Sequence, residues 1–180
     1  MREIEIKAKV ADKDSLLTAI KDAGIALSEP IKQHDIVYGQ AGVAANAAGS
    51  IWLRIRTEND TTTIFTFKQQ HTGGLDSIEH ETEVADAQQM TAIIAALGFT
   101  LYSDLTKTRQ KGRYNDIEIC VDDVEGLGVF VEAEKLADED ADGETVTTEL
   151  WRILELLGVD RSGEVFEGYD VLLNKKLAQS

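Results

Sequence analysis

Cysteine is almost absent from this chain, since Cys120 is the one cysteine among 180 residues. A single thiol excludes an intrachain disulfide framework and a zinc cage built from cysteines. Long apolar runs are missing as well, because no window approaches the roughly 18 consecutive apolar residues of a membrane-spanning helix. The first residues are charged and contain no apolar signal-peptide core. We therefore expect a cytoplasmic protein without a membrane partner.

Basic residues are also fewer than acidic ones. The chain has 18 Lys and Arg against 33 Asp and Glu, which gives a formal net charge of −15. Such an acidic surface repels nucleic acid over long distances, so we expect no nucleic-acid partner. A small anionic ligand remains compatible with this charge if basic side chains converge locally or a divalent cation neutralises it. The sequence also lacks a Walker-type phosphate-binding loop and a nucleophilic serine or cysteine motif.

The remaining composition, 43% hydrophobic and 28% charged, is ordinary for a globular protein. The length fits one domain covering residues 1–180, and no repeat or linker divides it. Apolar residues at helical spacing predict helices at 13–23, 86–97, 144–157 and 164–176. Alternation of side chains predicts strands at 2–10, 36–38, 51–57, 62–69, 77–84, 113–121 and 129–134, with a turn at Gly73-Gly74. The predicted fold class is α+β.

Charged side chains occupy one face of several predicted strands. In Glu3-Ile4-Glu5-Ile6-Lys7 the charged residues point to one side and the isoleucines to the other. A sheet with one face in water alternates in the same way. Here, however, acidic and cationic residues fall on separate strands. The acidic set is Glu3, Glu5, Glu132 and Glu134, and the cationic set is Arg54, Arg56, Lys68, Lys107 and Arg109.

The two sets suit two different ligands. Carboxylates provide the oxygen ligands that Mg²⁺ prefers. Arginine and lysine bind phosphate oxygens, and arginine can do so through two parallel hydrogen bonds. If the sheet closes into a barrel, both sets would face one cavity suited to a metal–polyphosphate complex.

Glu3-x-Glu5-x-Lys7 also matches the ExExK signature of the CYTH superfamily, the triphosphate tunnel metalloenzymes. Later segments resemble further motifs of this superfamily in the same order: 34–38, 53–56, 66–68, 79–83 and 107–109. Two more segments, 121–134 and 169–173, resemble the branch that contains the class IV adenylyl cyclases. The resemblance spans residues 2 to 173.

This resemblance implies an antiparallel eight-stranded β-barrel, or tunnel, with helices packed outside. It implies Mg²⁺ or Mn²⁺ as cofactor, with Glu3, Glu5 and Glu134 as metal ligands and Glu132 as a further contributor. The implied catalytic residues are Glu3, Glu5, Lys7 and Glu134. The implied triphosphate-binding residues are Lys7, Arg54, Arg56, Lys68, Lys107 and Arg109, with Asp122 beside the site. The family often has an arginine where this chain reads Asp76-Ser77-Ile78. The chain therefore lacks one expected contact to a phosphate, which leaves the exact substrate open.

Two reactions fit the resemblance. The first is that of a class IV-like adenylyl cyclase, which converts ATP to cyclic AMP and pyrophosphate. The alternative is hydrolysis of a terminal phosphate by an inorganic tripolyphosphatase or a thiamine triphosphatase. A binding module without turnover is a third hypothesis, although the intact set of Glu3, Glu5 and Glu134 argues against it. A homodimer is the default expectation for a soluble enzyme of this size.

Overall fold

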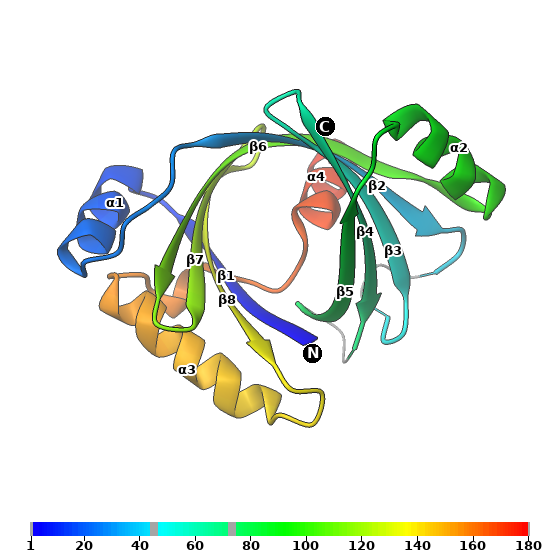
Figure 1. Cartoon of the computed structure of the whole chain (residues 1–180). Coiled ribbons are helices and arrows are strands. Elements are labelled where there is room, and N and C mark those ends of the chain that lie inside the picture. The colour runs from blue at the N-terminus through cyan, green and yellow to red at the C-terminus, as the bar shows by residue number, and fades with distance from the viewer. Residues whose placement is uncertain (1, 44–46, 72–74, 180) are drawn as a thin grey trace. The chain divides into compact units, whose positions relative to one another are not determined.

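The computed structural model describes residues 2–43, 47–71 and 75–179, so the turn predicted at Gly73-Gly74 lies outside the described residues (Figure 1). Two compact units are present. Unit 1 comprises Met1–Pro30 and Thr108–Phe166, and unit 2 comprises Ile31–Lys107 and Glu167–Ser180. The long strand β6 (Phe99–Tyr114) contributes residues to both units. A single domain over the whole chain stays a prediction.

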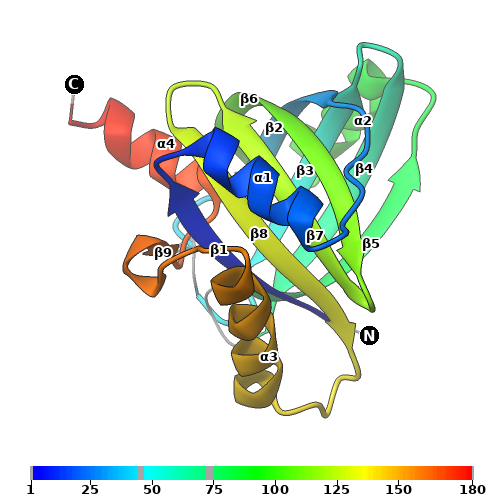
Figure 2. The same cartoon turned by 90° about the vertical axis from the view of Figure 1, so that its left-hand side faces the viewer.

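Unit 1 is built on an antiparallel sheet. Strand β1 (Arg2–Val10) pairs with β8 (Gly128–Ala137), and β8 pairs in turn with β7 (Ile117–Val124). The two-residue strand β9 (Glu164–Val165), which follows the short 3₁₀ helix η1 (Arg161–Gly163), pairs with β1. Helices α1 (Lys13–Asp22) and α3 (Gly143–Leu156) lie over the same face of this sheet (Figure 2).

The core of unit 1 fills the space between the sheet and its two helices. Ile4 and Ile6 of β1 are buried there against Ile20 of α1 and against Leu150 and Trp151 of α3. Burying each large apolar side chain contributes about 1.5–3 kcal/mol, which fixes the face that each strand turns toward the helices. The predicted alternation is therefore confirmed for β1, and its charged residues occupy the opposite face.

Unit 2 contains an antiparallel meander with strand order β5-β4-β3-β2 and the first part of β6 next to β2. The strands are β2 (Ile31–Gln40), β3 (Ile51–Glu58), β4 (Thr62–Gln70) and β5 (Asp76–Glu83). Helix α2 (Ala87–Ala96) packs on this sheet through Ile94, which joins Tyr38, Leu53 and Ile55 in a second core. Helix α4 (Tyr169–Leu177) also belongs to unit 2.

Three of the four predicted helices are confirmed, each beginning after an aspartate. Asp12, Asp86 and Asp142 accept hydrogen bonds from backbone N–H groups of the first helical turn, as N-cap residues do. The helix predicted at 164–176 is wrong at its start. Glu164 and Val165 form β9 against β1, and α4 begins only after Gly168.

The strand predicted at 113–121 is also wrong, because a turn interrupts it. Asn115 adopts a left-handed φ of 55° between the end of β6 at Tyr114 and the start of β7 at Ile117. Most of β6 was not predicted. Its buried positions include Lys107 and Arg109, so apolar alternation does not mark the strand.

None of the helices in the described part of the chain is long and apolar enough to cross a membrane.

Two leucines of α3 provide a matched test of the unit 1 core. Leu150 is 0% exposed and Leu156 is 60% exposed. We expect Leu150→Ala to lower the free energy of unfolding by about 2–5 kcal/mol through loss of burial and a residual cavity. Leu156→Ala should change it by less than about 0.5 kcal/mol. Urea denaturation measures both values, and equal losses would contradict the placement of α3.

Candidate functional site

The charged face of the unit 1 sheet brings three carboxylates together. The register of β1 and β8 places Glu5 opposite Glu134 and Lys7 opposite Glu132. Glu5, Glu132 and Glu134 each offer a carboxylate oxygen within 4.8 Å of the others. Three of the four predicted metal ligands are thus adjacent. Glu3 lies on the same face of β1 but is not a member of this three-residue group.

Two cations lie against these carboxylates. Lys7 Nζ is 3.0 Å from Glu5 Oε1 and 3.1 Å from Glu132 Oε1. Arg109 contacts Glu132, and its Nη1 lies 3.4 Å from Glu134 Oε1. The exposed fractions of these side chains lie between 3% and 12%. The charges therefore interact through protein rather than through water.

Asp122 completes this group from β7. It accepts hydrogen bonds from Arg109 Nε at 2.7 Å and from Arg109 Nη2 at 2.5 Å, and it is fully buried. This bidentate pair fixes the plane of the guanidinium group. Asp122 therefore lies beside the carboxylate cluster and orients Arg109.

Burial and neighbouring charges shift the pKa values of two residues in this cluster. Burial raises the pKa of Glu134 well above its ordinary value, and the nearby carboxylates add to this effect against the opposing charge of Arg109. Burial would lower the pKa of Lys7, but Glu5 and Glu132 outweigh it and raise that pKa. The carboxylates of Glu5, Asp122, Glu132 and Glu134 lie close together beside Lys7 and Arg109, and this proximity makes negative charge in the cluster costly. A divalent cation would cancel that charge, and its preferred ligands are already present.

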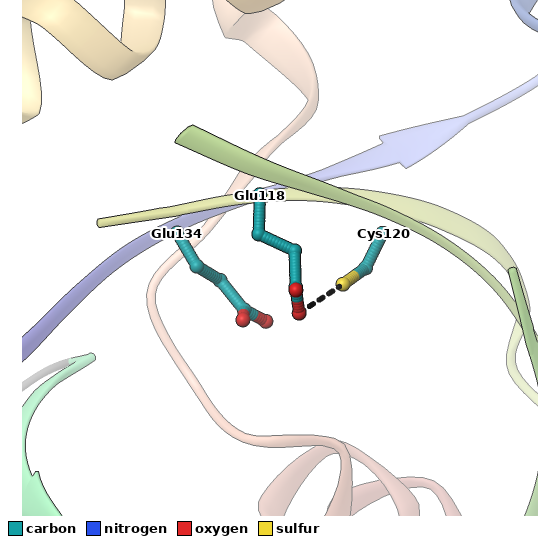
Figure 3. Close-up of side chains that lie close together, drawn as sticks. All are labelled: Glu118, Cys120 and Glu134. Carbon is teal, nitrogen blue, oxygen red and sulfur yellow. Dashed lines mark hydrogen bonds between the residues drawn. The ribbon is translucent and has the colours of Figure 1, made fainter. Parts of the chain in front are cut away.

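A second group adjoins the first on β7. Glu118 and Cys120 point to the same side as Glu134, and the three ligand atoms lie within 4.8 Å of one another (Figure 3). The Cys120 thiol donates to Glu118 Oε1 at 3.7 Å, and Lys111 Nζ lies 2.7 Å from that oxygen. Burial, reinforced by the charge of Glu134, raises the pKa of the Cys120 thiol. A protonated buried thiol is a poor nucleophile, in line with the absence of a nucleophilic cysteine motif from the sequence.

In unit 2, Arg56 and Asp35 form a buried bidentate ion pair. The residues face each other across β3 and β2, and Arg56 Nε and Nη2 each donate to an Asp35 oxygen at 2.7 Å. Burial would raise the pKa of Asp35, but Arg56, Arg54 and Lys107 hold it well below its ordinary value. The charge of Asp35 is therefore shared by three of the cations predicted to bind phosphate.

Strand β5 supplies acidic partners for two cations. Lys68 Nζ lies 2.7 Å from Glu79, and Arg54 Nη2 lies 2.9 Å from Glu81. Burial opposes ionisation of Glu79, but Lys68 and Arg54 lower its pKa to about 2. The register of β4 and β5 places Lys68 directly opposite Glu79. In unit 2 the acidic and cationic strands therefore pair with each other, which corrects the expectation of separate acidic and cationic clusters.

Ser77 occupies the region where an arginine is missing. It is fully buried, and its hydroxyl donates to Glu79 Oε1 at 3.0 Å. This hydrogen bond supports the ionised form of Glu79 that also binds Lys68. The position therefore stabilises a carboxylate where a cation was the family expectation.

Lys107 lies in a different environment. It is 3% exposed, and its Nζ lies 4.9 Å from the centroid of the Tyr169 ring. Sequence reasoning used Tyr169 only as part of a C-terminal motif. No spacing rule could pair residues this far apart in the chain, because the contact depends on where α4 packs.

Comparison with known proteins gives a family match over most of the chain. The CYTH domain model matches residues 1–169. A Methanocaldococcus jannaschii protein with the name "putative adenylate cyclase" is 30% identical over 171 residues, which cover 94% of this chain and 97% of that protein.

Solved structures with the same fold come from distant organisms. A conserved hypothetical protein from Pyrococcus furiosus has a TM-score of 0.81 at 23% identity, over 94% of this chain and 99% of that one. A Hippeastrum protein described as a "putative adenylyl cyclase" with a dominant triphosphatase activity has a TM-score of 0.58 at 16% identity, over 93% of this chain and 90% of that one.

These likenesses extend over nearly the whole length of the chain. They confirm the predicted fold class, the antiparallel α+β fold of CYTH proteins. Because the family model covers far more than half of the sequence, the chain belongs to the CYTH domain family.

Proposed function

We propose that this protein is a divalent-metal-dependent enzyme that acts on a triphosphate. The observation that carries the proposal is the cluster of Glu5, Glu132 and Glu134, whose carboxylate oxygens lie within 4.8 Å of one another. Mg²⁺ is commonly held by carboxylates together with substrate phosphates, and Mn²⁺ accepts the same ligands. When bound, either ion would stabilise charge that develops on phosphate oxygens. The proposed metal ligands are Glu3, Glu5, Glu132 and Glu134.

The basic residues would hold the phosphates. Arg54 supports this role, because its Nε is buried and has no hydrogen-bond partner among the residues that the structure describes. A phosphate oxygen would satisfy that donor at little cost in reorganisation. Asp35 keeps the guanidinium group of Arg56 in one orientation, which favours precise positioning of a phosphate. The proposed phosphate-binding residues are Lys7, Arg54, Arg56, Lys68, Lys107 and Arg109, with Asp122 orienting Arg109.

Adenylyl cyclase activity is our first candidate. It is favoured by the relative named as a putative adenylate cyclase, which is 30% identical over almost the whole chain. In this reaction the ribose 3′-oxygen of ATP forms a bond to the α-phosphorus while the bond to the pyrophosphate oxygen breaks. Lys7, together with the carboxylates Glu3, Glu5 and Glu134, would form the catalytic set. Electrostatic stabilisation and positioning supply most of the catalysis in such transfers.

Hydrolysis of tripolyphosphate or thiamine triphosphate is the alternative. It is favoured by the dominant triphosphatase activity described for the Hippeastrum protein, which shares the fold. Water would then attack a terminal phosphorus, and the same basic residues would hold the remaining phosphates. The cytoplasmic location, the homodimer and the lack of nucleic-acid partners stay predictions from the sequence.

Product analysis separates the two reactions. The purified chain is incubated with ATP, inorganic tripolyphosphate or thiamine triphosphate, each with Mg²⁺ or Mn²⁺. Cyclic AMP and pyrophosphate from ATP are expected for the cyclase. Orthophosphate from tripolyphosphate or thiamine triphosphate, with ATP unchanged, would replace the cyclase by the hydrolase. Absence of turnover with all three compounds would contradict the proposed enzyme.

Substitution of one carboxylate tests the metal ligands. We expect Glu134→Gln to reduce turnover by at least about a hundredfold, since even groups that only orient metal ligands contribute 10–100-fold. Glu149→Gln is the matched control, because Glu149 pairs with Lys135 from α3 and is not in the cluster. Circular dichroism checks that both variants fold. Equal activity of the folded Glu134→Gln and Glu149→Gln variants would refute the assignment.

A further inference from the structure

Helix α4 presents an aromatic ring to a buried cation of the proposed phosphate-binding set. Tyr169 is the first residue of α4, and its ring lies 4.9 Å from Lys107 Nζ. We propose that Tyr169 is a positioning residue that holds the Lys107 ammonium group where it can bind a triphosphate. The inference rests on the proposed function, which assigns Lys107 to phosphate binding.

The position of the ring is fixed by the packing of α4. Tyr169 is 7% exposed, and Val171 in the same helical turn is also buried. Further along the helix, Asn174 Nδ2 donates to the backbone oxygen of Tyr102 at 2.9 Å. Tyr102 and Lys107 belong to the same strand, β6. The helix is therefore attached to the strand that carries Lys107, and the ring has little freedom to move away from it.

The ring stabilises a charge that burial disfavours. Lys107 is 3% exposed, and a buried ammonium group requires compensation for its lost hydration. Its charge also acts on Asp35, but both oxygens of Asp35 accept hydrogen bonds from Arg56. The face of an aromatic ring carries partial negative charge and attracts a cation within about 6 Å of the centroid. Tyr169 thus adds attraction for the ammonium group.

This arrangement places the ammonium group near other cations. The charges of Lys107, Arg54 and Arg56 all lower the pKa of Asp35, so the three cations lie within electrostatic reach of one carboxylate. Cations this close repel one another, and a flexible lysine would turn away from the others. The ring offsets this tendency and keeps the site organised before a ligand arrives, which reduces the entropy lost on binding.

Isothermal titration calorimetry of the full chain with inorganic tripolyphosphate, in EDTA so that no turnover occurs, tests the proposal. Tyr169→Leu removes the ring, and we expect the dissociation constant to rise between about twofold and thirtyfold. Tyr169→Phe keeps the ring face and should restore binding close to that of the wild type. Leu177→Ala changes an exposed side chain at the end of α4, so its dissociation constant should not change.

A double-mutant cycle separates positioning from a general structural effect. In a Lys107→Met background, Tyr169→Leu should cause no further loss of affinity, because the ring then has no ammonium group to hold. An undiminished loss in that background, or an equal loss in Leu177→Ala, overturns the proposal. If the wild type binds tripolyphosphate and Tyr169→Leu binds it equally well, the positioning role of Tyr169 is overturned. The proposed function is not affected by that result. A wild type that neither binds tripolyphosphate nor turns over any triphosphate overturns the proposed function as well.

Discussion

Glu132 is 2% exposed. The need to pair its buried charge constrains the strand register on the charged face of unit 1. An unpaired carboxylate at that depth would cost several kcal/mol, so cations must reach it from neighbouring strands. Lys7 does so from β1 and Arg109 from β6. Lys7 can meet Glu132 only in a register that also sets Glu5 opposite Glu134. The alignment that satisfies one buried charge therefore assembles the carboxylate cluster.

The two units solve the problem of buried charge with opposite results. In unit 1, burial and the neighbouring carboxylates disfavour negative charge on Glu134, which a divalent cation would favour. In unit 2 the cations proposed to bind phosphate have compensating neighbours, among them the carboxylate of Asp35 and the ring of Tyr169. A phosphate group that binds there competes with carboxylates already in place. Binding strength in unit 2 consequently depends on exchange between anions, whereas in unit 1 it depends on relief of repulsion among carboxylates.

Local rules were sufficient to predict much of the fold and part of the site. Strict alternation in β1 identified its charged face, and apolar residues at helical spacing located three helices. Contacts between distant segments were beyond those rules. The pairing of Lys68 with Glu79 depends on the register of β4 and β5. A shift of one residue would turn the side chains of one strand to the opposite face of the sheet. Strand β6 was missed because Lys107 and Arg109 are buried at positions where a simple pattern requires apolar residues.

Under the proposed function, the types of residue present do not distinguish cyclisation of ATP from hydrolysis of a terminal phosphate. Both reactions need oxygen ligands for a metal and cations for phosphate oxygens, and one set of side chains can supply these to either. The two reactions differ in which phosphorus lies in line with the nucleophile, and an error of about 1 Å in that alignment can cost about a hundredfold in rate. Groups that orient the cations therefore bear on this alignment. Asp35 fixes Arg56 by two hydrogen bonds, and Tyr169 restrains Lys107 through its ring. Neither residue needs to touch a phosphate to influence that alignment.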